Sequence, residues 1–230
     1  MTSEVTLLPL HLDVIKPSGG TPPPEGELLE MTKRVHERDT KTCRYCGMYS
    51  PNGSALEVDH VDGDHSNWDM DNLVSACLWC HGCHHLEFSL AAGAQLVQWD
   101  YSQAACSRIA QQIIVSGNLF ELYNRMVEAG AGRREHNYPG GIIDILVSSL
   151  SRKVSDGEYA EVRRILDSME ADSIRLAYPT NQYLGAVQTI PGVSPSAWKH
   201  FRRYYINYVN DNISDSNLTA KLMKAWIDLA

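Results

Sequence analysis

The spacing of apolar residues changes along this chain, from short extended stretches in the first half to helical repeats in the second. Residues 5–15 are rich in aliphatic side chains that partly alternate with polar ones, which predicts an edge strand in which Pro9 limits pairing. A proline- and glycine-rich stretch over 17–26 predicts a linker or an extended arm. Apolar residues at helical spacing then predict a helix over 27–38.

The next part of the chain predicts a ββα unit and one further strand. In order, the predicted elements are a strand over 55–60, a polar loop over 61–71, a short strand over 73–76, a helix from Leu78 to Gly93, and a strand over 94–99.

From Ser102 onward the apolar spacing is helical. The predicted helices begin at Ser102, at Asn118, near Ile142, at Ser155, at Ser194-Pro195 and near Leu218. Ser155 and Glu158 have the spacing of a capping box. The fold class expected is therefore α+β: an N-terminal strand and arm over 1–26, a small module over 27–101, and a helical domain over 102–230.

Length, net charge and the lack of long apolar runs limit the classes of protein to which this chain can belong. The 230 residues suffice for one or two domains with their own cores, and the formal net charge is −8 at pH 7. Nucleic-acid binders usually present a basic face, so the acidic balance does not favour nucleic acid as a partner. No apolar run approaches the roughly 18 residues that span a bilayer. The first residues lack the basic and apolar segments of a signal peptide, so the cytoplasm is the expected location.

Cysteine spacing predicts a metal site. Two Cys-x-x-Cys pairs, Cys43 with Cys46 and Cys77 with Cys80, can place four thiolates around one ion, and a closed Cys₄ site is structural zinc. The alternative is four unligated buried cysteines. Cys83 adds a second possibility, because Cys80 and Cys83 also form such a pair.

The residues between the two pairs resemble an HNH module. Asp59-His60 ends the first predicted strand, Asn72 precedes the second, and His81 stands at the third letter of the motif. The resemblance implies that His60 is a general base, that Asp59 and His81 hold a divalent metal such as Mg²⁺, Mn²⁺ or Ni²⁺, and that Asn72 orients the base or braces the loop. His85, four residues after His81, can share its helix face. In the alternative interpretation, His60 and His81 are polar residues packed on the zinc module without a catalytic role.

The HNH register also decides between the cysteines. The distance from Asn72-Leu73 to Cys77 matches the usual register, which selects Cys77 and Cys80 as the second pair. Cys83 is then expected to face the helix interior. Cys106, in a helical pattern, is expected to be a small buried apolar residue.

The acidic charge around this unit argues against binding of the phosphate backbone of a nucleic acid. No Lys or Arg occurs from Tyr45 through Ser107. The acidic residues of that stretch are Glu57, Asp59, Asp62, Asp64, Asp69, Asp71, Glu87 and Asp100. A nuclease needs cations to clamp its substrate. Cations elsewhere in the chain, such as Lys33, Arg38 and Arg202, also fit ordinary solvated faces, and the aromatic residues between 198 and 208 fit core packing and a protein interface better than nucleic acid.

Further features together resemble the IcmJ/DotN family of type IVB secretion systems and related conjugative plasmids. They are the run 35–39, the Cys43/Cys46 pair, Asp62-Gly63-Asp64, Asn72-Leu73-Val74, the cysteines at 77, 80 and 83, and Ala94-Gln95-Leu96 leading to Ser102-Gln103. The resemblance covers roughly the first half of the chain; the second half is similar only in helical character. This chain departs from better-known members in keeping Asp59-His60 and Cys80-His81.

The resemblance implies an HNH-like fold with structural zinc, used as a binding subunit. Such a subunit would dock on the C-terminal tail of a coupling ATPase, beside other coupling-complex subunits. It would lie in the cytoplasm or peripherally at the inner membrane through the secretion complex, without inserting into the membrane. The first hypothesis is therefore a zinc-stabilised adaptor of a coupling complex. The alternatives are a metal-dependent HNH endonuclease with His60 as base, and a zinc module that binds nucleic acid without cutting it.

Overall fold

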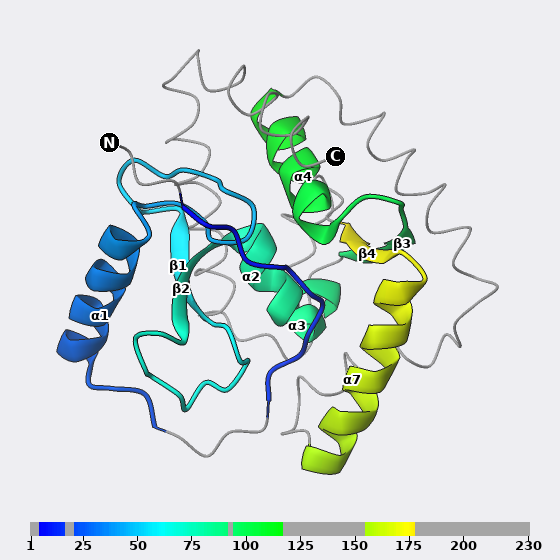
Figure 1. Cartoon of the computed structure of the whole chain (residues 1–230), viewed down its shortest axis with the longest axis horizontal. Helices are drawn as coiled ribbons and strands as arrows, with labels where there is room; N and C mark the ends of the chain where they lie inside the picture. Colours follow the sequence, from blue (N-terminus) through cyan, green and yellow to red (C-terminus); the bar gives the residue numbers. More distant parts are fainter. Residues whose placement is uncertain (1–4, 17–20, 92–93, 117–154, 178–230) are drawn as a thin grey trace.

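The computed structural model describes residues 5–16, 21–91, 94–116 and 155–177 (Figure 1). Its elements are α1 (Glu25–Arg38), β1 (Leu56–His60), β2 (Leu73–Cys77), α2 (Leu78–His84), α3 (Leu86–Ala91), β3 (Gln95–Gln98), α4 (Gln103–Ser116), α7 (Asp156–Ala171) and β4 (Ile174–Ala177). The α+β content is as predicted. The helices expected near residues 118, 142, 194 and 218 lie outside the described residues, and the division into an arm, a module and a helical domain stays a prediction.

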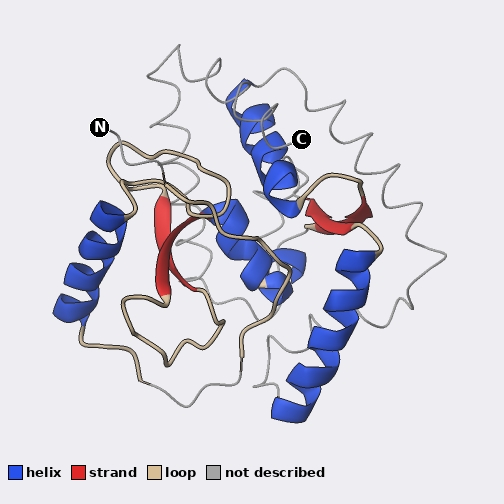
Figure 2. Cartoon of the chain, in the orientation of Figure 1, coloured by secondary structure: helices blue, strands red, loops and turns tan. Residues whose placement is uncertain are grey.

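Two separate antiparallel strand pairs form the β structure of the described residues (Figure 2). β1 pairs with β2, with Val58 opposite Ser75, and the predicted ββα order is confirmed. α1 and α2 both contact this hairpin, and Figure 1 shows them on opposite sides of it. β3 pairs with β4, with Leu96 opposite Leu176.

The outer edge of β2 is covered by side chains and loop backbone in place of a third strand. The Asp39 carboxylate accepts the Ser75 N–H at 2.7 Å, and the Arg44 N–H donates to the Ser75 carbonyl at 2.8 Å. Two residues earlier in β2, the Leu73 carbonyl accepts a hydrogen bond from Arg38 Nη2 at 2.6 Å. Unpaired strand edges are free to pair with other chains, so these contacts both complete the hairpin and close its edge.

The N-terminal segment forms no strand, and the prediction of an edge strand over 5–15 is wrong. This segment is extended and crosses α2 and α3 (Figure 1). Its backbone bonds go to a loop and to a helix end: the Leu8 N–H donates to the Arg44 carbonyl at 2.7 Å, and the Asp13 N–H to the Cys83 carbonyl at 2.8 Å. Leu12 and Val14 are buried. The alternation of apolar and polar residues that suggested a strand therefore reflects the burial of one side of this extended segment.

The single helix predicted from Leu78 to Gly93 is broken at His85, so that prediction is corrected. The Leu86 N–H, which a continuous helix would direct to Gly82, donates instead to the Asp13 carbonyl at 3.0 Å. The Ser89 hydroxyl donates to the freed Gly82 carbonyl at 2.8 Å. Insertion of the N-terminal segment into the helical ladder thus separates α2 from α3.

Helix α7 begins as the sequence predicts. The Glu158 N–H donates to Ser155 Oγ at 3.3 Å, and the Ser155 N–H donates to the Glu158 carboxylate at 2.8 Å, which is a complete capping box. Ser102 likewise accepts the Ala105 N–H at the start of α4. β4 was not predicted, because only four residues form it and its partner β3 is distant in the sequence.

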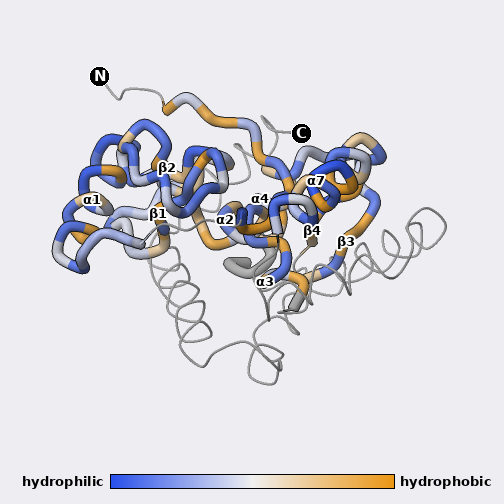
Figure 3. Tube along the Cα trace, turned by 90° about the horizontal axis from the view of Figure 1, so that it is seen from below, coloured by the Kyte–Doolittle hydropathy of each residue, from blue (hydrophilic) through white to orange (hydrophobic). Residues whose placement is uncertain are grey.

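One cluster of buried residues joins the N-terminal segment, the β1–β2 hairpin and the later elements, while α1 contributes no residue to it. It runs from the cysteines beside β2 through α4 to α7 and β4, and it includes Cys106, as predicted. Figure 3 shows that α1 and the loops beside β1 are mostly hydrophilic, whereas α7 carries hydrophilic and hydrophobic residues on different sides. Among the helices that the structure describes, none has the length and apolar character needed to cross a bilayer.

Asp39 should contribute stability that depends on pH. Burial opposes its ionisation, but hydrogen bonds from Arg38, the Ser75 N–H and Arg44 hold the pKa of this carboxyl below its usual range. We expect Asp39→Asn to lower the free energy of unfolding by about 2 kcal/mol at pH 7, since charge-assisted hydrogen bonds contribute about 1.5–3 kcal/mol. The measurement is chemical denaturation, with the exposed Asp71→Asn as control.

The pH dependence of that difference is the sharper measurement. The carboxyl titrates near pH 3.9 in the unfolded chain, to within about one unit, and at a lower pH in the folded protein. Its contribution is thus present above about pH 4 and is lost as pH falls through the folded pKa. The difference between wild type and Asp39→Asn should shrink in acid; a difference that stays constant down to pH 3 would contradict this role.

Candidate functional site

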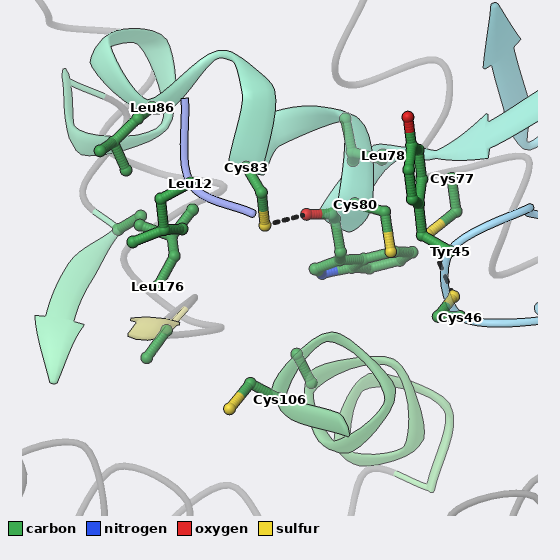
Figure 4. Close-up of a cluster of buried hydrophobic side chains, with 14 of the residues drawn as sticks. Leu12, Tyr45, Cys46, Cys77, Leu78, Cys80, Cys83, Leu86, Cys106 and Leu176 are labelled. Atoms are coloured by element: carbon green, nitrogen blue, oxygen red, sulfur yellow. Dashed lines mark hydrogen bonds between the residues drawn. The ribbon is translucent and has the colours of Figure 1, made fainter. Parts of the chain in front are cut away.

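Four cysteines from two parts of the chain come together beside the β1–β2 hairpin. Cys43 and Cys46 lie in the turn after α1, Cys77 ends β2, and Cys80 lies in α2. Their Sγ atoms all lie within 4.8 Å of one another, and all four side chains are completely buried. Figure 4 shows Cys46, Cys77 and Cys80 near Tyr45.

The geometry of this cluster fits a tetrahedral zinc site. The Sγ atoms of Cys46 and Cys77 are 3.7 Å apart, and the cysteines are free thiols. Ligands about 2.3 Å from a zinc ion at tetrahedral angles lie about 3.8 Å from one another. Zinc would be held by all four thiolates with no position left open, so its role would be to hold the chain segments together.

The turn that carries the first pair is built for close approach of its thiols. The Gly47 N–H donates to the Cys43 carbonyl at 2.9 Å, and the Cys43 N–H donates to the Met48 carbonyl at 2.8 Å. Gly47 has φ of 71°, a conformation that favours glycine. The backbone therefore returns on itself directly after Cys46, which leaves both sulfurs on one side of the turn.

The structure separates the two remaining cysteines from this cluster. Cys83 donates its thiol to the Trp79 carbonyl at 3.2 Å, inside α2. Cys106 lies on α4, apart from the others in Figure 4, and burial raises the pKa of its thiol to about 12. Within the cluster, burial raises the pKa of Cys77 and Cys80, whereas hydrogen bonds from the neighbouring thiols overcome burial at Cys46 and lower its pKa.

A second group of possible metal ligands includes His81, which directly follows Cys80 in α2. Oxygen and nitrogen atoms of Asp59, His81 and His85 all lie within 4.8 Å of one another. The Nε2 atoms of His81 and His85 are 2.8 Å apart, because the two residues are one helical turn apart. His81 Nε2 also lies 3.6 Å from Asp59 Oδ1. Two imidazoles and a carboxylate can bind a divalent ion and leave positions open for water or substrate.

Neighbouring side chains orient Asp59 so that one oxygen is free for a ligand. Tyr45 and His84 both donate to Asp59 Oδ2, each at 2.7 Å. Burial disfavours ionisation, but the charge and hydrogen bond of His84, together with His81 and Tyr45, hold the pKa of Asp59 far below its usual range. The carboxylate is therefore ionised at neutral pH, with Oδ1 turned toward His81.

A carboxylate also orients His81. Glu57 bonds to Nδ1 of this imidazole, which directs Nε2 toward Asp59 and His85. Burial opposes protonation, but Glu57 and then Asp59 outweigh it and raise the pKa of His81 to about 9. A histidine that binds a metal through one ring nitrogen usually donates its other ring N–H to a carboxylate, which fixes the orientation of the ring.

His60 lies beside this group and outside it. Its ring stacks on His65, with centroids 4.7 Å apart, and the His65 ring lies 5.0 Å from that of His85. Burial is the main cause that lowers the pKa of His60, which keeps the imidazole neutral at pH 7. Its Nε2 is buried and has no hydrogen-bond partner among the described residues. A neutral imidazole with a free nitrogen has the protonation state that a general base needs.

Asn72 braces the loop between the strands. Its side-chain oxygen accepts the Asp62 N–H at 3.0 Å, and its amide donates to Asp62 Oδ1 and to the Asn67 carbonyl. Of the two roles expected for Asn72, the described contacts show bracing of the loop.

The sequence pattern did not indicate the residues that orient Asp59 and His81. Tyr45, Glu57 and His84 were not predicted to take part. The alternation of β1 offered one signal, since Glu57 and Asp59 lie two residues apart and so share a strand face. Nothing in the sequence indicated Tyr45, which reaches Asp59 from the turn of the first cysteine pair.

We expect the zinc-loaded protein to bind a second divalent ion, which titration calorimetry with Ni²⁺ or Mn²⁺ would detect. His85→Ala should weaken this binding more than about tenfold, because even outer-shell partners contribute 10–100-fold. Affinity should rise with pH up to about 9, since the ion competes with the proton on His81. The exposed His11→Ala is the control. Equal affinity in wild type and His85→Ala would exclude this site.

Comparison with known proteins gives one curated relative. No family model matches the chain. Over 55 residues, 33% are identical to the Type 4 apparatus protein DotN of Legionella pneumophila. The match covers 24% of this chain and 25% of DotN, so it spans about a quarter of that protein. The resemblance to the IcmJ/DotN family that the sequence predicts is thereby confirmed as a similarity to DotN over this segment.

Proposed function

We propose that this chain is a zinc-stabilised, HNH-like adaptor subunit of a type IV secretion or conjugative coupling complex. The observation that carries the proposal is the similarity to DotN, a type 4 apparatus protein, in a chain whose four buried cysteines fit a structural metal site. In this proposal zinc holds the module in shape, and the surface of the module binds protein.

The charges near the module support a protein partner. Arg38, at the end of α1, donates to the Asp39 carboxylate and to the Met70 and Leu73 carbonyls. Lys16 donates to the Asp62 carbonyl. These cations complete the fold and are not available to clamp phosphates.

The loop between β1 and β2 presents the opposite charge. Asp69 and Asp71 are exposed, and Asp64 is partly exposed. A polyanion would be repelled from this loop, whereas a basic protein segment would be attracted to it. The partner implied by the family resemblance is the C-terminal tail of a coupling ATPase, together with other coupling-complex subunits, in the cytoplasm or at the inner membrane.

Co-purification of the full chain with the cognate coupling ATPase tests this function. A complex should form with the intact ATPase and be lost when its C-terminal tail is deleted. Asp71→Lys, in the acidic loop, should weaken the complex, and Glu161→Lys, exposed on α7, serves as the matched control. The absence of any complex with the intact ATPase would contradict the adaptor function.

A second function, metal-dependent HNH endonuclease, is favoured by one specific observation. Asp59, His81 and His85 form a group that fits a catalytic metal, and His60 is close by with a free, neutral nitrogen. A bound divalent ion would supply Lewis acidity at a scissile phosphate. In this alternative His60 takes the proton of the attacking water, and Asp59 and His81 hold the metal.

Incubation of the purified protein with plasmid DNA and Mg²⁺, Mn²⁺ or Ni²⁺ tests the alternative. Nuclease activity should appear with one of these metals and fall by at least about 100-fold in His60→Ala, in line with loss of a general base. The exposed His11→Ala serves as control. Nicking that is equal in wild type and His60→Ala would identify a contaminant and leave the adaptor function as the better account.

A further inference from the structure

Helix α4 places two polar side chains against the four-cysteine cluster. Gln111 Nε2 lies 3.4 Å from Cys46 Sγ and 3.3 Å from Cys77 Sγ, within hydrogen-bond distance of both. Arg108 precedes Gln111 by three residues, so both lie on one face of the helix. Gln111 is completely buried and Arg108 is 3% exposed.

Arg108 is a buried cation without an acidic partner in the described part of the chain. Its Nε and Nη1 atoms have no hydrogen-bond partner, and no carboxylate forms an ion pair with it among the residues that the structure describes. Burying a guanidinium without a counter-charge is energetically costly. An anion close to this side chain would offset that cost.

The cysteine cluster is the group that Arg108 faces. Its Nη2 atom lies 3.4 Å from the position that a Cβ on Gly47 would occupy, and Gly47 directly follows Cys46. The charge of Arg108 acts on the Cys46 thiol and favours its thiolate. The guanidinium thus lies over the turn that carries the first cysteine pair.

We propose that Arg108 and Gln111 form the outer shell of the four-cysteine metal site, so that metal binding and the packing of α4 are coupled. A divalent ion held by four thiolates carries a net negative charge, which the guanidinium offsets. The side-chain amide of Gln111 donates to the Cys46 and Cys77 sulfurs and so orients these two ligands. The inference rests on the cysteines holding a metal ion, as the proposed function does.

The coupling extends from α4 to the second strand pair. At the start of α4, Gln103 accepts the Leu176 N–H at 2.8 Å and donates to the Leu176 carbonyl at 3.1 Å. Gln111 and Arg108 lie on the same helix, so the metal site and β4 are joined through α4. Loss of metal is therefore expected to loosen α4 together with its contacts to β4, beyond the cysteine turns themselves.

Zinc affinity, measured by chelator competition on the full chain, tests this role. Arg108→Met should weaken zinc binding by about 10–100-fold. Arg108→Lys, which keeps the charge, should retain most of the affinity, and Gln111→Met should lose about tenfold. Arg164→Met, exposed on α7, is the control and should bind zinc as wild type does. Gln111→Met keeps the inference testable if Arg108→Met fails to fold.

Hydrogen exchange supplies an independent readout. In wild type, chelation of zinc should speed exchange of α4 amides, and the amides of β4 should follow. Zinc affinities of Arg108→Met and Gln111→Met equal to wild type, or equal α4 protection with and without zinc, would overturn the inference. A wild-type chain that binds no zinc would overturn both the metal assignment and this inference, whereas failure of the ATPase complex alone would leave it intact.

Discussion

The buried contact among Cys43, Cys46, Cys77 and Cys80 is the constraint on which the rest of the structure depends. The β1–β2 hairpin has only five residues in each strand, and a hairpin of that size is marginal without further support. The cysteines tie the turn after α1 to the junction of β2 and α2. Metal–thiolate bonds at this point would fix three elements at once, inside the buried cluster that the cysteines share with Tyr45 and Trp79.

The position of α2 then determines the second group of ligands. Cys80 faces the cysteine cluster, while the next residue, His81, faces Asp59 and His85. Anchoring Cys80 therefore also sets the position of the neighbouring His81, and Tyr45, from the first cysteine turn, donates to Asp59. The structural centre and the possible catalytic centre are thus mechanically linked. If the chain is an adaptor without nuclease activity, Asp59, His81 and His85 would still be held together, because the four-cysteine cluster fixes the position of α2.

Local signals in the sequence predicted much of this arrangement, and long-range contacts account for what they missed. The Cys-x-x-Cys spacing, the two strands around a polar loop, and the capping box at Ser155 are each decided within a few residues. The break at His85 could not be predicted in this way, because it arises from Asp13, far away in the sequence. The same holds for Tyr45 and His84 at Asp59, and for β4, whose four residues become a strand only beside β3. In the N-terminal segment the apolar pattern was correct about burial, but pattern alone cannot say where backbone hydrogen bonds go.

The central claim is that four cysteines hold one zinc ion on which the module depends. Its most direct measurement is the metal content of the purified chain, together with its folding in Cys43→Ser and in the matched Cys106→Ala. We predict about one tightly held zinc per chain in wild type and Cys106→Ala, and an unfolded module in Cys43→Ser, because site formation and folding are coupled. A soluble, folded and zinc-free Cys43→Ser protein would contradict the claim.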